Sequence, residues 1–287
     1  MTTALGTALI TGASSGIGAV YADRLARRGH DLILVARNRE RLQTVAERLT
    51  TQTGRSVETL VADLGRAEDL RRVEQILRSK SDISVLVNNA GVGSVTPLVD
   101  SDVDAMEAMI HLNATALTRL TYAYAPGAVL RKGTVINIAS IVAVVPELLN
   151  GVYGASKAFV LAFSQSLHRE LGEKGLRVQV VLPGATATDF WEIAGAPVES
   201  LPQEWVMTAE DMVDAALAGL DQGEVVTLPA LPDVTLWDTY QSARQTLSGN
   251  LSSSRPAERY VRAFSSQPTG HTSNEAGAGR AGDVTRS

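Results

Sequence analysis

Short apolar runs alternate along this chain with longer segments in which apolar residues recur every three or four positions. Leu32–Ala36 has the length of a buried parallel strand. In the segment after it, Leu42, Val45, Ala46 and Leu49 mark one face of a helix. The same reading predicts seven strands, at 5–11, 32–36, 57–61, 85–87, 134–139, 178–182 and 225–228. Helices are predicted at 16–28, 39–53, around 70–77, 102–124, 153–171 and 209–220.

Capping residues mark several of these boundaries. Asn38 can cap the second helix, and Gly29 and Gly54 suit the left-handed position that ends the first and second helices. Strands that alternate with helices predict an α/β fold, a doubly wound parallel sheet of about seven strands with helices on both faces. Right-handed crossovers would then bring the carboxyl ends of the strands, and the motifs after them, to one edge.

Composition narrows the function classes. The chain has 287 residues, of which 45% are hydrophobic and 20% charged, so it can bury a sizeable core. A net charge of -5 disfavours a nucleic-acid binder. The absence of cysteine excludes disulfides, and four scattered histidines show no metal-ligand spacing, so no metal site is expected. Without a leader or a long apolar segment, we expect a soluble, cytoplasmic protein that is not bound to a membrane.

A glycine-rich loop follows the first predicted strand. Gly12, Gly16 and Gly18 let the backbone turn and approach a pyrophosphate, whose charge is favoured at the N-terminus of the next helix. The spacing is G-x-x-x-G-x-G and not the dinucleotide pattern G-x-G-x-x-G. A glycine-rich turn without a ligand is the alternative, and the position after a first buried strand disfavours it.

The end of the second strand predicts the cofactor. NAD-binding proteins usually place an acid there, whereas this chain has Arg37 followed by Asn38. A guanidinium can hydrogen-bond a 2′-phosphate, so we predict NADP(H) over NAD(H). Arg37 as a solvated arginine at a helix start is the alternative, and Arg39 and Arg41 are interpreted as surface residues.

A second cluster carries acid–base chemistry. Tyr153 and Lys157 lie one turn apart on a predicted helix, and Ser140 follows the fifth strand. A nearby cation favours the ionised phenol, so we expect Lys157 to lower the pKa of Tyr153 from about 10. The Ser140 hydroxyl can hold a substrate oxygen beside that phenol. Taken singly, Tyr153 and Lys157 could be an exposed pair on a helix, and Ser140 could be a turn or cap residue. Together with a phosphate-binding loop earlier in the chain, they indicate a nicotinamide-dependent oxidoreductase.

Together the motifs resemble the short-chain dehydrogenase/reductase family, over about residues 5–230. The resemblance implies a single Rossmann-type catalytic domain. The matching segments, in the family's order, are Thr11 to Gly18, Asp63-Leu64, Asn88-Asn89-Ala90-Gly91, Asn113, Ser140, Tyr153 with Lys157, and Pro183-Gly184 with Thr188.

The resemblance also implies roles for individual residues. Tyr153 would act as general acid or base, Lys157 would support it and bind the nicotinamide ribose, Ser140 would hold the substrate oxygen, and Asn113 would anchor a water in a proton relay. The cofactor-binding set implied is Gly12, Ser14, Ser15, Gly16, Ile17, Gly18, Arg37, Asp63, Leu64, Asn89, Ala90, Gly91, Tyr153, Lys157, Pro183, Gly184, Thr186 and Thr188. Without the family, Asp63 reads as a helix cap and Asn88-Asn89 as a turn.

Residues beside these motifs predict the substrate. The walls are assigned to Val92, Val142, Leu148, Leu149, Phe190 and Trp191. Since most of them are apolar, we expect a small-molecule substrate that is an apolar ketone, aldehyde or alcohol and not a charged metabolite. The segment from Phe190 is either a closing lid or a long loop.

The remaining predictions concern organisation and function. We expect one catalytic domain over 1–264, with a C-terminal extension at 231–264, and a disordered tail at 265–287. The resemblance implies a homodimer or homotetramer. The leading hypothesis is an NADP(H)-dependent oxidoreductase that interconverts a carbonyl and an alcohol. A non-catalytic NADP(H)-binding sensor is the alternative, and an epimerase or dehydratase is disfavoured because no second substrate domain is visible.

Overall fold

The strands form one parallel sheet. The computed structural model of the protein describes residues 5–265, and the sheet has the order β3-β2-β1-β4-β5-β6-β7. The strands are β1 (Thr7–Thr11), β2 (Asp31–Ala36), β3 (Val57–Val61), β4 (Ile83–Asn88), β5 (Thr134–Ile138), β6 (Arg177–Val181) and β7 (Val226–Thr227). The order reverses between β1 and β4, so the crevice at this switch point lies at the carboxyl ends of both strands. The predicted fold class is confirmed.

Helices connect the strands and flank the sheet. They are α1 (Gly16–Arg27), α2 (Arg39–Thr53), α3 (Ala67–Ser79), α4 (Val103–Ile110), α5 (Leu117–Arg131), α6 (Gly151–Leu171), α7 (Phe190–Ala194), α8 (Ala209–Gln222), α9 (Val234–Ser248) and α10 (Glu258–Ser265). A π-helical turn, His111–Ala116, joins α4 to α5. Short 3₁₀ turns lie at Leu98–Asp100, Ile141–Ala143, Pro146–Leu148, Val198–Ser200 and Gln203–Trp205.

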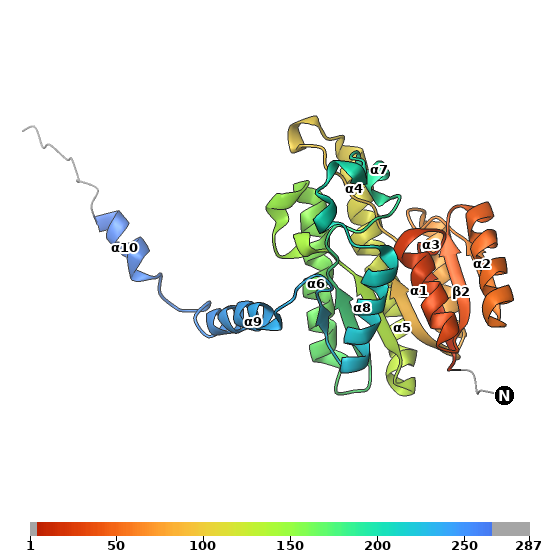
Figure 1. The fold of residues 1–287 in the computed structure, drawn as a ribbon. Coiled ribbons are helices and arrows are strands. Elements are labelled where there is room, and N and C mark those ends of the chain that lie inside the picture. Colours follow the sequence, from red (N-terminus) through yellow and green to blue (C-terminus); the bar gives the residue numbers. More distant parts are fainter. Residues whose placement is uncertain (1–4, 266–287) are drawn as a thin grey trace, which may run out of the picture. The chain divides into compact units, whose positions relative to one another are not determined.

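Two apolar layers cover the two faces of the sheet. In β1, Ala8 and Ile10 pack in the layer made with α1, α2 and α8, whereas Leu9 packs in the layer made with α3, α5 and α6. Consecutive side chains of a strand point to opposite faces, which is why strands buried on both sides read as continuous apolar runs. Figure 1 shows α1 and α8 adjacent on one face of the sheet.

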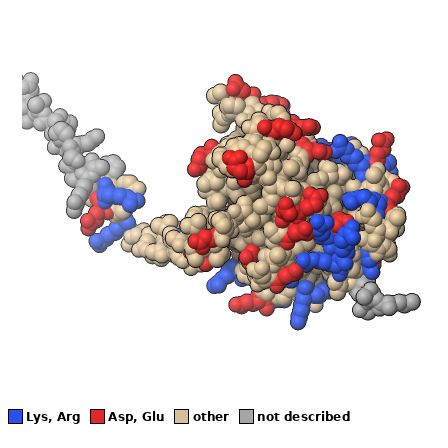
Figure 2. All heavy atoms as spheres, viewed as in Figure 1, with Lys and Arg blue, Asp and Glu red and all other residues tan. Residues whose placement is uncertain are grey.

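Ion pairs join α1 to α8 on the outer surface. Arg24 pairs with Asp214 at 2.7 Å, and Arg28 pairs with Asp221 at 2.8 Å. Figure 2 shows basic and acidic side chains intermixed over these helices. This surface is a network of paired charges, in which exposed pairs contribute little individually.

The capping predictions hold in the structure. The Asn38 side chain accepts a hydrogen bond from the Arg41 amide at 3.0 Å, and Gly29 and Gly54 have φ of 102° and 66°. Most of the other predicted boundaries shift by one to three residues, but the helix predicted at 102–124 differs more, since it is divided into α4, the π-helical turn and α5. The helix expected to end at Tyr124 continues through Pro126 to Arg131, because Ala125 and Ala128 bury their side chains against the sheet. Packing therefore outweighs the hydrogen bond that proline cannot make.

The chain divides into two compact units, Met1–Leu231 and Pro232–Ser287. The first carries the sheet and every motif. Within the second, Asp233 caps α9 by accepting a hydrogen bond from the Thr235 amide at 2.9 Å, and the Trp237 and Tyr240 rings lie 5.3 Å apart. Apart from Ser265, the predicted tail at 265–287 lies outside the described residues.

Candidate active site

The glycine loop between β1 and α1 combines left-handed backbone with close packing. Gly12 and Gly16 have φ of 66° and 51°, conformations that favour glycine. A Cβ at Gly18 would lie within 2.5 Å of the Asn89 amide nitrogen and closer still to the Gly12 carbonyl oxygen. The loop therefore needs its glycines both for its turn and for its close packing.

The start of α1 is open to an anion. Ser15 occupies the N-cap position but makes no side-chain capping bond, so the first amides of the helix remain available. Ser14, Ser15 and Ile17 are half-buried around this N-terminus. A dinucleotide pyrophosphate fits a helix N-terminus of this kind, where amides and the helix dipole favour negative charge.

The end of β4 holds this loop in place. Thr11 Oγ1 accepts hydrogen bonds from the amides of Asn89 and Ala90, both at 3.0 Å. The Asn89 side chain donates to the carbonyls of Thr11 and Gly12 at 2.9 and 3.2 Å. Asn89 thus holds the conformation of the glycine loop. Thr11, which is not in the predicted cofactor-binding set, fixes the end of β4 to this loop.

Arg37 directly follows β2 and has an exposed side chain with no hydrogen-bond or ion-pair partner among the residues the structure describes. A 2′-phosphate would supply that partner. Asp63 accepts a hydrogen bond from the Gly65 amide at 2.9 Å, within the turn before α3. It is not the helix cap considered from sequence, since Arg66 occupies the N-cap position of α3. Leu64 is buried, and Asn88 lies in a buried network with Asn137, so it is no surface turn.

Helix α6 places two of the predicted catalytic residues. It begins after Asn150, whose side chain accepts hydrogen bonds from the amides of Val152 and Tyr153 at 2.9 and 3.3 Å. Tyr153 and Lys157 follow on the face buried against the sheet, and the ammonium lies 5.9 Å from the centre of the phenol ring. The expected pair is thus adjacent, and it is buried rather than exposed.

The Lys157 ammonium occupies a nearly closed site. Its Nζ donates a hydrogen bond to the Ile138 carbonyl at 2.9 Å. Burial lowers the pKa of Lys157 from 10.5 to about 8, because charge is costly to remove from water. This ammonium has two further protons, which the ribose hydroxyls of a bound nucleotide could accept.

The pKa of Tyr153 shifts in the direction opposite to the one predicted. Burial raises the pKa of its phenol to about 12, and a hydrogen bond with the Ser140 side chain opposes that rise only in part. The expected lowering of this pKa is therefore wrong for this structure, because loss of water on burial favours the neutral phenol. Ser140 Oγ accepts from the Val142 amide at 3.3 Å, which leaves its own proton free for the phenol oxygen.

Asn113 lies within the π-helical turn, a feature that frequently marks functional positions. Its side chain donates to the Val92 carbonyl at 2.8 Å and accepts from the Val92 amide at 3.0 Å. It also donates to Ser156 Oγ at 3.0 Å, which in turn donates to the Tyr153 carbonyl at 2.8 Å. Asn113 is thereby joined to the turn of α6 that carries the catalytic pair.

A glycine makes this approach possible. A Cβ at Gly91 would lie 3.0 Å from Asn113 Oδ1 and 3.5 Å from Lys157 Nζ. The structure therefore brings Asn113, Ser140, Tyr153 and Lys157 together at the carboxyl edge of the sheet. Ser156 was not predicted, although its place between Tyr153 and Lys157 was a signal.

The segment after β6 lies against the glycine loop. A Cβ at Gly16 would lie 3.0 Å from Thr188 Cγ2. Thr186 is buried and forms a β-bridge with Met207, and the Pro183 carbonyl accepts from the Ile141 amide at 3.0 Å. The backbone at Gly184 is uncrowded, since nothing lies within 4 Å of a Cβ placed there. Thr188 is thus the residue of this segment that lies against the glycine loop.

The predicted substrate walls are only partly assembled. Val142 and Tyr153 form a buried cluster with Met109, against which Val92, Leu149 and Phe190 pack. Leu148 is 57% exposed and stands outside this cluster. Trp191 is buried, and its indole N–H donates a hydrogen bond to the Thr186 carbonyl at 2.9 Å. It therefore stabilises the segment after β6 and is not part of the buried cluster around Val142. Met109 was missed, although it lies one turn before Asn113.

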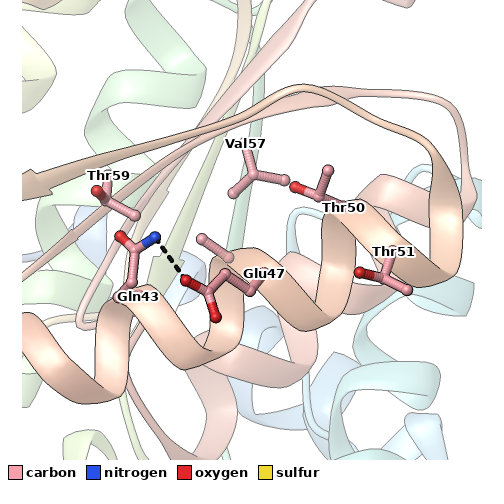
Figure 3. A pocket seen from close by; sticks show the side chains of 7 residues that line it. Gln43, Glu47, Thr50, Thr51, Val57 and Thr59 are labelled. Atoms are coloured by element: carbon pink, nitrogen blue, oxygen red, sulfur yellow. Dashed lines mark hydrogen bonds between the residues drawn. The ribbon is translucent and has the colours of Figure 1, made fainter.

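A separate hollow of about 260 Å³ lies between α2 and β3 (Figure 3). It is lined by Gln43, Ala46, Glu47, Thr50, Thr51, Val57 and Thr59. Its one internal hydrogen bond runs from Gln43 Nε2 to Glu47 Oε1 at 3.0 Å. It shares no residue with the catalytic cluster, so we assign it no part in the chemistry.

Within residues 5–265, no helix combines the length and the apolar character that a bilayer crossing requires. The cytoplasmic location stays a prediction.

Comparison with known proteins places this site in a family. The sequence pattern described as short chain dehydrogenase matches residues 6–197. A short-chain dehydrogenase from Sphingobium yanoikuyae, solved in complex with NADPH, is 48% identical, with a TM-score of 0.86 over 89% of this chain and 99% of that one. The bulky-bulky ketone specific alcohol dehydrogenase from Comamonas testosteroni is 44% identical, with a TM-score of 0.83 over 90% and 100%.

Curated relatives agree with the structural ones. The very-long-chain 3-oxoacyl-CoA reductase of Anas platyrhynchos is 36% identical over 208 residues, or 70% of this chain. The first curated relatives are matched over 59% to 67% of their own length. These relatives are dehydrogenases and reductases, so the alternative of a non-catalytic sensor is not supported, and the NADPH of the Sphingobium protein agrees with the predicted cofactor. The chain belongs to the short-chain dehydrogenase/reductase family and is an oxidoreductase of that family.

Proposed function

We propose that this protein reduces an apolar ketone or aldehyde to the alcohol with NADPH, and catalyses the reverse oxidation with NADP⁺. The observation that carries this proposal is the geometry of the site: the buried Tyr153 phenol lies beside the Ser140 hydroxyl, and the Lys157 ammonium is 5.9 Å from the centre of its ring. In reduction, a carbonyl, NADPH and one proton give an alcohol and NADP⁺. The cofactor, when bound, supplies the hydride.

Tyr153 supplies the proton. Its raised pKa keeps the phenol protonated at neutral pH, as a general acid requires. Ser140 can donate a hydrogen bond to the same substrate oxygen and so stabilise the negative charge that develops there. The two residues therefore define where the carbonyl oxygen must lie, and the apolar residues around Val142 exclude water from it.

Lys157 supports the acid electrostatically. Once Tyr153 has given up its proton, the resulting phenolate lies beside a buried cation, which stabilises it more strongly than water-exposed charge would. Asn113 and Ser156 orient the backbone around this pair by hydrogen bonds on buried atoms. The proton lost from Tyr153 is restored from solvent along this polar edge of the site.

The substrate class follows from the lining and from the relatives. The cluster of Met109, Val142, Leu149 and Phe190 is apolar, which favours a hydrophobic carbonyl compound. The relatives are named for bulky ketones and for very-long-chain 3-oxoacyl-CoA substrates. We propose a ketone with at least one large apolar substituent.

We also propose that the protein is a homo-oligomer through α5 and α6. Tyr122 stacks on Phe163 at 6.5 Å, and Phe163 stacks on Phe159 at 5.8 Å. Tyr122 is 69% exposed and Phe159 is 42% exposed. An exposed stack of aromatic rings across two helices is typical of a protein–protein interface.

Tyr153→Phe tests the acid. The substitution removes the phenol oxygen and keeps the ring, so NADPH should bind with an unchanged dissociation constant while ketone reduction falls by at least about 10²-fold. NADPH fluorescence titration and NADPH absorbance with acetophenone measure the two quantities. Turnover within threefold of the wild type would refute the role.

Arg37→Ala tests the cofactor. Loss of the guanidinium should raise the dissociation constant of NADPH by about tenfold or more and leave that of NADH within about twofold. Arg39→Ala, on the same surface, is the matched control. Equal losses for both nucleotides, or a preference for NADH in the unaltered protein, would contradict the assignment.

The rate of reduction should depend on pH through Lys157. Its lowered pKa means that the ammonium is present below about pH 8 and is lost as pH rises above it. We expect kcat/KM for ketone reduction to be level from pH 6 to 7 and to fall above about pH 8. Circular dichroism at each pH provides the control for folding. A profile that stays level to pH 9.5 would show that this ammonium is not required.

Introducing negative charge into the exposed aromatic stack on α5 and α6 tests the proposed homo-oligomer. Tyr122→Glu combined with Phe159→Glu should convert the oligomer to a monomer in light scattering coupled to gel filtration, because two carboxylates would be buried without partners. Val99→Glu, which alters an exposed apolar residue elsewhere, should leave the mass unchanged. A wild-type protein that runs as a monomer at micromolar concentration would contradict the proposal.

A further inference from the structure

An aromatic side chain lies directly beside the catalytic phenol. Phe190 is the first residue of α7, and its ring centre is 5.7 Å from that of Tyr153, with the two planes inclined at 43°. Phe190 packs on the same buried cluster as Val142 and Met109. A substrate whose carbonyl oxygen reaches Tyr153 must therefore place one of its substituents close to this ring.

The tip of the Phe190 ring fits against a position without a side chain. A Cβ at Gly93 would lie 2.8 Å from Phe190 Cε2 and closer still to Cζ, well inside van der Waals contact. The φ of Gly93 is outside the left-handed region, so its backbone would accept an alanine. The aromatic ring, and not the backbone, is what requires glycine at position 93.

The helix that carries Phe190 is tied down on both sides. At its start, Asp189 pairs with Arg41 of α2 at 2.7 Å, which gives Arg41 a partner across the fold. At its end, the Ala194 carbonyl accepts from the Val95 amide at 3.0 Å. The Trp191 ring meets Phe190 edge-on at 5.6 Å. These contacts fix where the Phe190 ring points.

We propose that Gly93 and Phe190 form one specificity-determining pair, in which the ring is a wall of the substrate site beside Tyr153 and Gly93 is the recess that keeps the ring out of that site. The pair sets how large a substituent the ketone can carry on that side. This inference rests on the proposed carbonyl reduction and adds to it the residues that select substrate size. Removing the ring enlarges the site, and filling the recess pushes the ring into it.

A double-mutant cycle on substrate size tests the pair. The variants are Phe190→Ala, Gly93→Ala and the two combined, with Ile193→Ala as control, since Ile193 is on the same helix but 64% exposed. The ratio of kcat/KM for benzophenone to kcat/KM for acetophenone is measured at saturating NADPH. The dissociation constant of NADPH is measured by fluorescence for every variant.

Phe190→Ala should raise this ratio by at least about tenfold. Gly93→Ala should lower it by at least about fivefold in the wild-type background and change it by less than twofold once Phe190 is alanine, because the methyl group then has no ring to displace. Ile193→Ala should leave the ratio within twofold. NADPH binding should be the same in all variants.

Two results would overturn the inference alone: a ratio that Phe190→Ala leaves within twofold, or an effect of Gly93→Ala that is equal in both backgrounds. If circular dichroism shows that the Phe190→Ala variant is unfolded, Phe190→Leu is used in its place. Phe190→Leu should raise the benzophenone-to-acetophenone ratio of kcat/KM by a smaller factor. A wild-type protein that binds NADPH but reduces neither ketone contradicts the proposed function, and this inference with it.

Discussion

The buried bond from the Lys157 ammonium to the Ile138 carbonyl is the contact on which the site depends. It joins α6 to the carboxyl end of β5. Two turns further along α6, Ser164 accepts a hydrogen bond from the Asn137 side chain at 2.9 Å, which is a second tie between the same two elements. With both bonds made, α6 can neither slide nor rotate on the sheet, so Tyr153 is held opposite Ser140.

That burial also decides the acid–base character of the site. Loss of water raises the pKa of the Tyr153 phenol and lowers that of the Lys157 ammonium, because in each case it disfavours the charged form. The phenol is therefore a proton donor in the protein without its cofactor. The Lys157 ammonium keeps one hydrogen bond inside the protein, to the Ile138 carbonyl.

Glycines let polar groups approach one another at this edge. Gly91 admits Asn113 next to Lys157, Gly12 and Gly18 admit the Asn89 amide, and Gly93 admits the Phe190 ring. In each case a Cβ would crowd a group to which we assign a role in positioning the cofactor or the substrate. The sheet supplies rigid strand ends, and the absent side chains allow the site to be assembled on them.

The order of the seven strands, most of the helices between them and the capping residues Asn38, Gly29 and Gly54 could be read from the sequence. The motifs predicted to be catalytic and phosphate-binding were also found there. Such features are local: they depend on periodicity within one element or on residue types at short spacing. Other features depended on contacts between distant segments. Four features are of this kind. They are the continuation of α5 through Pro126, the Asn113–Ser156 hydrogen bond, the direction of the Tyr153 pKa shift and the close contact of the Phe190 ring with Gly93. Packing, loss of water and steric fit arise only when segments far apart in the chain meet, so the tertiary structure alone determined them.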